Sequence, residues 1–89
     1  MSFKIETIRS RHRKTLKISG RLQCENLTEL QKQMDTDPAQ TVLDVSEVTL
    51  VDREVVRFLN ACQDQGVEVA NPCLYIREWM NRERNLESQ

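Results

Sequence analysis

The sequence predicts a small α/β domain with a mixed four-stranded sheet, in which an N-terminal antiparallel hairpin is followed by parallel β-α-β crossovers, and with about three helices. Two segments of alternating apolar and polar residues flank a polar turn near the N-terminus. After them, apolar runs typical of strands alternate with amphipathic segments typical of helices, which favours right-handed crossovers. The length of 89 residues suits one domain. We place it at residues 1–84, with a frayed tail over residues 85–89.

The predicted hairpin joins residues 3–8 to residues 15–19. Phe3 and Ile5 fall on one face of the first strand, and the second strand repeats the alternation of apolar and polar residues. Gly20 is expected to end the second strand, because glycine frees the backbone to change direction.

The turn of this hairpin, residues 9–14, is strongly basic. It contains Arg9, Arg11, Arg13 and Lys14, together with His12. Such a run can mark a nucleic-acid patch. A solvated turn is favoured instead, because the run holds no aromatic residue to stack on bases and the chain has a net charge of −1. We therefore expect no nucleic-acid partner.

The middle of the chain predicts a helix over residues 23–34 and a strand over residues 41–45. The helix is indicated by apolar residues at spacings of three and four, namely Leu27, Leu30 and Met34. Residues 35–38 end in proline and close the helix. The nearly continuous apolar run of the strand predicts a central position among parallel neighbours, covered on both faces.

Residues 46–52 form the predicted loop after this strand, and Asp52 is the predicted N-cap of the next helix. Its carboxylate can accept a hydrogen bond from the backbone N–H of residue 54 or 55. The helix buries one apolar stripe, made by Val55, Phe58, Leu59 and Cys62. Gly66 stands where a left-handed residue commonly ends a helix.

The end of the chain predicts a short strand over residues 67–70 and a last helix. Asn71 is expected to cap this helix, with Pro72 at its first position. One face of the helix carries Cys73, Ile76 and Met80. Tyr75 and Trp79 lie beside that face, where they are either part of the core or an exposed anchor for a partner or a second copy.

The composition argues against several classes of function. No stretch approaches the roughly 20 apolar residues of a membrane helix, so we expect no membrane insertion and a cytoplasmic location. The cysteines (Cys24, Cys62 and Cys73) form no Cys-x-x-Cys pair, and there is a single histidine, so we expect neither disulfides nor a metal site. The sequence has no glycine-rich phosphate loop and no nucleophile elbow. We expect no cofactor and no enzymatic activity.

Three stretches carry a family resemblance. They are Ile18-Ser19-Gly20-Arg21-Leu22, Val42-Leu43-Asp44-Val45-Ser46-Glu47-Val48-Thr49-Leu50-Val51-Asp52 and Val69-Ala70-Asn71-Pro72. With these stretches the chain resembles the STAS domain family, the module named for sulfate transporters and anti-sigma-factor antagonists. The resemblance covers nearly the whole chain, and its central stretch is the specific one. It implies the same α/β fold and the role of a small interaction module.

The resemblance also implies a site. In the anti-sigma-factor antagonists, a serine or threonine directly after the loop aspartate is phosphorylated by a partner kinase, and the added charge turns a binding surface off. Asp52 matches that aspartate, but Arg53 follows it, and Val55 stands where the family often has glycine. A guanidinium cannot accept a phosphoryl group. The chain therefore resembles a STAS variant that lacks the phosphorylatable serine.

The candidate partner-binding residues are Ser46, Thr49, Asp52, Arg53, Glu54 and Arg57. The two hydroxyl residues either satisfy local backbone groups or serve as alternative phosphorylation sites. Asp52 acts as a helix cap alone, or it also shapes a partner surface. The three charged residues after it form either a solvated face or a protein contact patch.

The leading hypothesis for function is a non-enzymatic interaction module in bacterial signalling. Its partner would be an anti-sigma factor or a related serine-kinase-type regulator. The alternatives are a cytoplasmic accessory subunit of a transporter ATPase, and a homodimeric or ligand-binding STAS-like module.

Overall fold

The computed structural model of the protein describes residues 3–34 and 38–87. The strands are β1 (Phe3–Arg9), β2 (Lys14–Leu22), β3 (Thr41–Val51) and β4 (Glu68–Ala70), and the helices are α1 (Leu27–Gln33), α2 (Arg53–Asp64) and α3 (Leu74–Glu87). Short 3-10 helices at Cys24–Asn26 and Pro38–Gln40 precede α1 and β3. The predicted helix closure at residues 35–37 lies outside the described residues.

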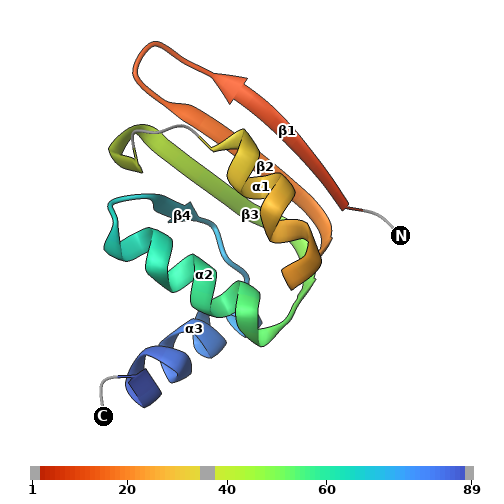
Figure 1. Cartoon of the computed structure of the whole chain (residues 1–89), viewed down its shortest axis with the longest axis vertical. Coiled ribbons are helices and arrows are strands. Elements are labelled where there is room, and N and C mark those ends of the chain that lie inside the picture. The colour runs from red at the N-terminus through yellow and green to blue at the C-terminus, as the bar shows by residue number, and fades with distance from the viewer. Residues whose placement is uncertain (1–2, 35–37, 88–89) are drawn as a thin grey trace.

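The sheet has the order β1-β2-β3-β4. The pair β1–β2 is antiparallel, whereas β2–β3 and β3–β4 are parallel. The predicted mixed four-stranded sheet with three helices is therefore confirmed, as is the central position of β3. Figure 1 shows α1 and α2 on one face of the sheet, with α3 beside α2 at the β4 end.

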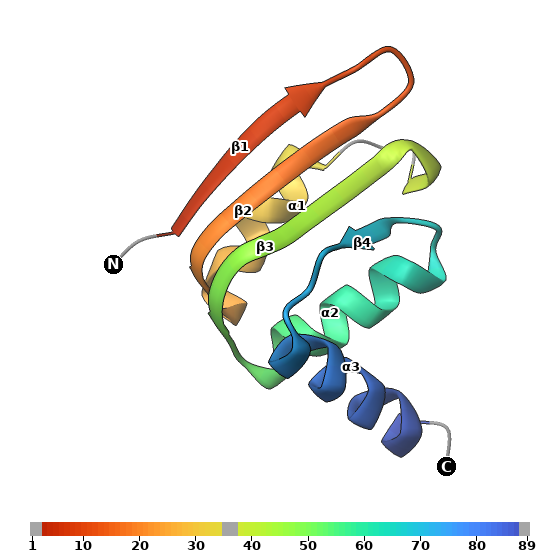
Figure 2. The ribbon, with the colours of Figure 1, turned by 180° about the vertical axis from the view of Figure 1, so that it is seen from behind.

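The opposite face of the sheet is open. Within the described residues, Figure 2 shows no helix over β1, β2 and β3 on that side, so the prediction that the central strand is covered on both faces is wrong. Val42 is nevertheless only 7% exposed. It lies on the open face between Thr15 of β2 and Glu68 of β4, which stand opposite it in the neighbouring strands. Long neighbouring side chains can shield a small apolar residue without a helix above it.

The core lies between the sheet and the helices. Its fully buried members are Leu16, Ile18, Leu22, Leu30, Leu43, Val45, Val55, Val56, Leu59 and Ile76. Strand residues alternate between the faces of the sheet, so the apolar set of β2 and β3 points to one side, where the apolar stripes of the helices cover it. This packing fixes the position of α2 against the sheet and of α3 against α2.

The two inner strands are longer than the sequence predicts. β2 continues through Gly20, whose φ is 87°, and the register with β3 shifts between Lys17 and Ser19 and again between Gly20 and Arg21. Such bulges let pairing resume beyond an irregular position. β3 therefore extends to Val51, and residues 46–51, which were predicted to be a loop, are a strand.

The ends of α3 also differ from the prediction. Asn71 adopts a left-handed conformation with φ 57°, so it does not cap the helix, which begins at Leu74. Cys73 precedes the helix and is exposed, not part of the core. At the other end, α3 continues to Glu87, so residues 85–87 are helical where the sequence predicts a frayed tail.

Gly66 takes the predicted left-handed position after α2, with φ 101°. The Gly66 N–H donates to the Gln63 carbonyl (3.1 Å) and the Val67 N–H to the Cys62 carbonyl (2.9 Å), the paired bonds of a Schellman motif. A Cβ here would come no closer than 3.9 Å to Ala39, so backbone strain is the only obstacle to a side chain.

Gly66→Ala is expected to lower the free energy of unfolding by about 1–2 kcal/mol, because alanine at this φ is strained. Gly66→Asn should lose less, since asparagine tolerates left-handed conformations better. Urea unfolding monitored by circular dichroism measures both. Equal stability of the alanine variant and the wild type would contradict this interpretation of the turn.

Candidate functional site

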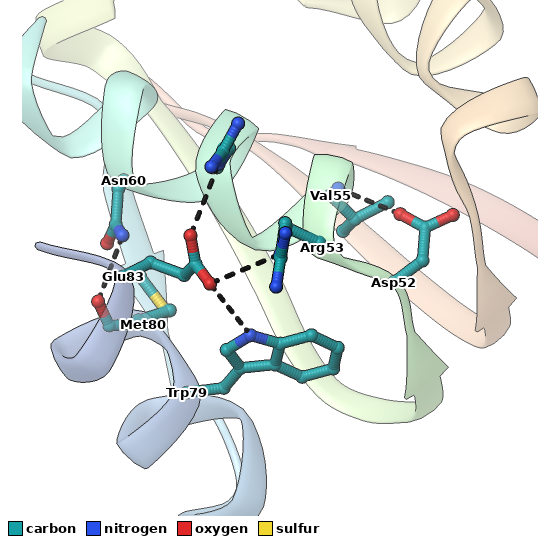
Figure 3. A network of polar contacts seen from close by, with 8 residues as sticks. Asp52, Arg53, Val55, Asn60, Trp79, Met80 and Glu83 are labelled. Carbon is teal, nitrogen blue, oxygen red and sulfur yellow. Dashed lines mark hydrogen bonds and ion pairs between the residues drawn. The ribbon is translucent and has the colours of Figure 1, made fainter. Parts of the chain in front are cut away.

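Asp52 links three parts of the fold. The Val55 backbone N–H donates to Asp52 Oδ1 (3.0 Å), which confirms the predicted N-cap of α2. Figure 3 shows this bond. The second carboxylate oxygen, Oδ2, accepts from the Cys24 backbone N–H (2.9 Å). Asp52 therefore connects the end of β3, the first turn of α2 and the segment that leads into α1.

The main feature near the start of α2 is a buried carboxylate that the sequence analysis did not single out. The Glu83 side chain on α3 is only 4% exposed. Arg57 Nε donates to its Oε1 (3.2 Å), and Trp79 Nε1 donates to its Oε2 (3.4 Å). Arg53 approaches the same Oε2 through Nε at 3.5 Å. Figure 3 shows Arg53 and Trp79 converging on Glu83.

The electrostatics of Glu83 follow from these partners. Burial alone would raise the pKa of this carboxyl, because it disfavours the charged form. The hydrogen bonds from Arg57 and Trp79 and the positive charges of the two arginines outweigh burial, so the pKa is lowered. Glu83 is thus a carboxylate that holds two arginines of α2 against α3.

A second set of polar contacts joins the same part of α3 to the C-terminal half of α2. Asn60 is buried, and its Nδ2 donates to the Met80 carbonyl (3.0 Å). Arg84 donates to the Asn60 carbonyl (3.1 Å), and its Nη1 lies 3.0 Å from Asp64 Oδ1. Polar contacts therefore join α2, from Arg53 to Asp64, to residues 80–84 of α3.

The six predicted site residues divide into two groups around Asp52. Ser46 and Thr49 are exposed on the last part of β3, where the Ser46 N–H donates to Asp44 Oδ1 (3.0 Å). Arg53, Glu54 and Arg57 are exposed residues of the first turns of α2. The two arginines are not a purely solvated face, since both contact Glu83. This contact explains why α2 tolerates a cation at its positive end.

The sequence pattern of α3 does indicate that Glu83 is buried. Ile76, Met80 and Glu83 are spaced four and three apart, so an acidic residue occupies the apolar stripe of α3. A carboxylate at a core position requires a cationic or hydrogen-bonding partner. Its partner Arg57 comes from a helix 26 residues earlier in the chain, and sequence spacing alone cannot identify such a pair.

An open groove of about 410 Å³ lies next to this network. It is lined by Arg53, Tyr75, Trp79, Arg82, Glu83 and Leu86. The Tyr75 and Trp79 rings contact each other, with centroids 5.9 Å apart and planes tilted by 52°. Trp79 packs partly against the core, whereas Tyr75 is 44% exposed. Of the two predicted roles, core residue and exposed anchor, Trp79 therefore fits the first in part and Tyr75 has the exposure that the second requires.

The basic hairpin turn is a separate feature. Its residues and Gln40 line a small pocket of about 180 Å³. Arg13 forms an ion pair with Glu68 (2.9 Å), which connects the start of β2 to β4. Both side chains are more than half exposed, so this ion pair adds little to stability.

The three cysteines differ in their surroundings. Cys62 is buried in the core, and burial raises its pKa to about 11. Cys24 is exposed, but partial desolvation and the neighbouring Asp52 charge raise its pKa. Cys73 is exposed.

We expect iodoacetamide at neutral pH to alkylate Cys73 first and Cys24 more slowly, because the thiolate is the reactive form. Cys62 should react only after unfolding. Mass spectrometry of timed samples gives the three rates. Fast labelling of Cys62 in the folded protein would contradict its burial.

Comparison with known proteins leaves the family open. A scan against models of known protein families finds no match, and neither does a search of curated protein sequences. Within residues 3–34 and 38–87, no helix is long and apolar enough to cross a membrane. In the same part of the chain, no cluster of three or more His, Cys, Asp or Glu side chains is arranged to hold a metal ion.

Proposed function

We propose that this protein is a non-enzymatic, STAS-like interaction module of bacterial signalling that binds a protein partner in the cytoplasm. Its binding surface is the start of α2 together with the exposed end of β3. The partner is an anti-sigma factor or a related serine-kinase-type regulator. Binding is constitutive with respect to position 53, where an arginine replaces a phosphorylatable residue.

The observation that carries this proposal is the fixed geometry at the start of α2. Asp52 bonds both the first turn of α2 and the segment before α1, and Glu83 holds Arg53 and Arg57. Exposed side chains on a preorganised helix end lose little entropy on binding, which favours affinity. A rigid charged surface of this kind suits the recognition of another protein.

The two alternative functions, a transporter subunit and a homodimeric or ligand-binding module, each require a different partner. An accessory subunit of a transporter would use the same surface to bind a transporter ATPase. A homodimeric or ligand-binding module would bind a second copy or a small molecule at the groove beside Trp79. The identity of the partner separates these functions.

The test is photo-crosslinking in the native cell. A benzoyl-phenylalanine replaces Glu54 in one variant and Gln31, an exposed residue of α1, in a control. We expect crosslinks from position 54 and not from position 31, and mass spectrometry identifies the product. A kinase-type regulator supports the leading proposal, and a transporter ATPase or a second copy supports the corresponding alternative. Crosslinks from position 31 alone would refute the proposed surface.

A further inference from the structure

The groove on the flank of α3 has walls of mixed chemistry. Tyr75, Trp79 and Leu86 supply apolar and aromatic surface, and Leu86 is 65% exposed. Arg53 and Arg82 supply cations at the same groove. Partly exposed aromatic residues beside arginines are the composition found at the energetically important centres of protein interfaces.

The charge of the groove is not balanced by the residues that line it. Two arginines line it against one carboxylate, that of Glu83. Glu83 is buried, and it already accepts hydrogen bonds from Arg57 and Trp79. The Arg53 side chain, by contrast, is 64% exposed, and its closest approach to Glu83 is a long 3.5 Å contact. The groove therefore offers guanidinium groups to an external anion.

We propose that this groove binds a segment of a protein partner in which an apolar side chain is flanked by aspartate or glutamate. The apolar side chain lies on Tyr75, Trp79 and Leu86, and the carboxylates pair with Arg53 and Arg82, since guanidinium groups bind carboxylates in a bidentate manner. This inference rests on the proposed function, because it specifies which partner chemistry the α2 surface and its neighbour recognise.

The position of the groove supports this occupant. Arg53 belongs both to the start of α2 and to the groove, so a partner that covers the proposed surface continues onto α3. Glu83 accepts a hydrogen bond from Trp79, which preorganises the aromatic contact, while the Arg53 guanidinium stays near it at 3.5 Å and remains exposed to a ligand. An acidic segment is favoured over nucleic acid because apolar surface, not a basic track, makes up most of the groove wall.

The experiment uses Trp79 as its own reporter, because it is the only tryptophan in the chain. A random-peptide phage library is selected on the full-length protein, and enriched peptides are synthesised and titrated by Trp79 fluorescence. We expect the peptides to carry an apolar residue next to aspartate or glutamate. Arg82→Glu should weaken their binding at least about tenfold, through charge reversal at the contact.

Two matched controls separate the groove from other basic surfaces. Arg77 is an exposed residue of the same helix that does not line the groove, and Arg11 lies in the basic hairpin turn. Arg77→Glu and Arg11→Glu should each leave the affinity within about twofold of the wild type. Circular dichroism confirms that each variant remains folded.

Three results would overturn the inference. The first is that no peptide is enriched. The second is that the enriched peptides lack acidic residues. The same holds if the peptides still bind the Arg82→Glu variant, or if they no longer bind the Arg11→Glu variant. The third is that single-stranded oligothymidylate changes Trp79 fluorescence and displaces the peptides, which would make nucleic acid the occupant. The proposed function would still stand in all three cases if position 54 crosslinks to a regulator.

Discussion

Replacing Glu83 with glutamine is expected to lower the melting temperature by roughly 10 °C, because this buried carboxylate has three partners. The substitution keeps the shape of the side chain but removes its charge. Arg53 and Arg57 then face each other across a neutral amide, and the amide NH₂ points at one of the present donors. Both arginines are partly exposed and can be solvated, so the cost arises at the buried amide, which cannot accept from all of the donors that the carboxylate satisfies.

The matched control is Glu78→Gln on the same helix, where the carboxylate is exposed. This change should leave the melting temperature within about 2 °C of the wild type. Differential scanning calorimetry measures both variants, and Trp79 fluorescence reports the local environment of the network. Indistinguishable melting of the Glu83→Gln and Glu78→Gln variants would show that the network does not hold α3 to α2.

The same residue gives the protein a defined response to acid. The pKa of Glu83 is lowered in the folded state, so the unfolded chain takes up the proton first as the pH falls. Its stabilising effect is therefore complete above the ordinary carboxyl range and is lost as the pH falls through the lowered value. Glu83→Gln should remove this part of the acid sensitivity, so its stability should change less than that of the wild type below about pH 4.

Replacing Asp52 with asparagine is expected to lower the free energy of unfolding by about 1–2 kcal/mol. The carboxylate accepts two backbone hydrogen bonds, from Val55 at Oδ1 and from Cys24 at Oδ2. Asparagine has one acceptor oxygen, so it can cap α2, but its NH₂ then faces the Cys24 N–H. The hydrogen bond from Cys24, which sequence spacing does not reveal, makes asparagine an incomplete replacement for this carboxylate.

An independent readout follows from Cys24. The Asp52 charge contributes to the raised pKa of this thiol, so Asp52→Asn should lower the pKa and speed alkylation of Cys24 at neutral pH. Asp64→Asn, which removes an exposed partner of Arg84, is the control and should change stability by less than about 0.5 kcal/mol. Unchanged stability and an unchanged Cys24 rate in the Asp52→Asn variant would contradict the double role of Asp52.

The fold was predictable because its signals are local. Alternation of apolar residues identified β1 and β2, and the run over residues 41–45 identified the central strand. The cap at Asp52 and the glycine at position 66 were also predictable, since each depends on a bond between residues at most five apart.

What the sequence did not predict depends on distant partners. Ser46 and Glu47 are polar, so they interrupt the apolar run in the sequence and indicate a loop. In the structure they are exposed, and pairing with β2 extends β3 past them. The contact between Asp52 and Cys24 spans 28 residues. The Glu83 network likewise exists only because α3 docks on α2, and no spacing within either helix specifies which arginine the carboxylate meets.

The proposed partner contacts both the start of α2 and the adjoining groove of α3. Chemical-shift mapping tests this contact most directly, by titrating the isotope-labelled protein with an acidic peptide enriched in the selection. We expect the largest shifts at Arg53, Glu54, the Trp79 indole N–H and Arg82. Shifts confined to the basic turn over residues 9–14, with the Trp79 indole signal unmoved, would contradict it.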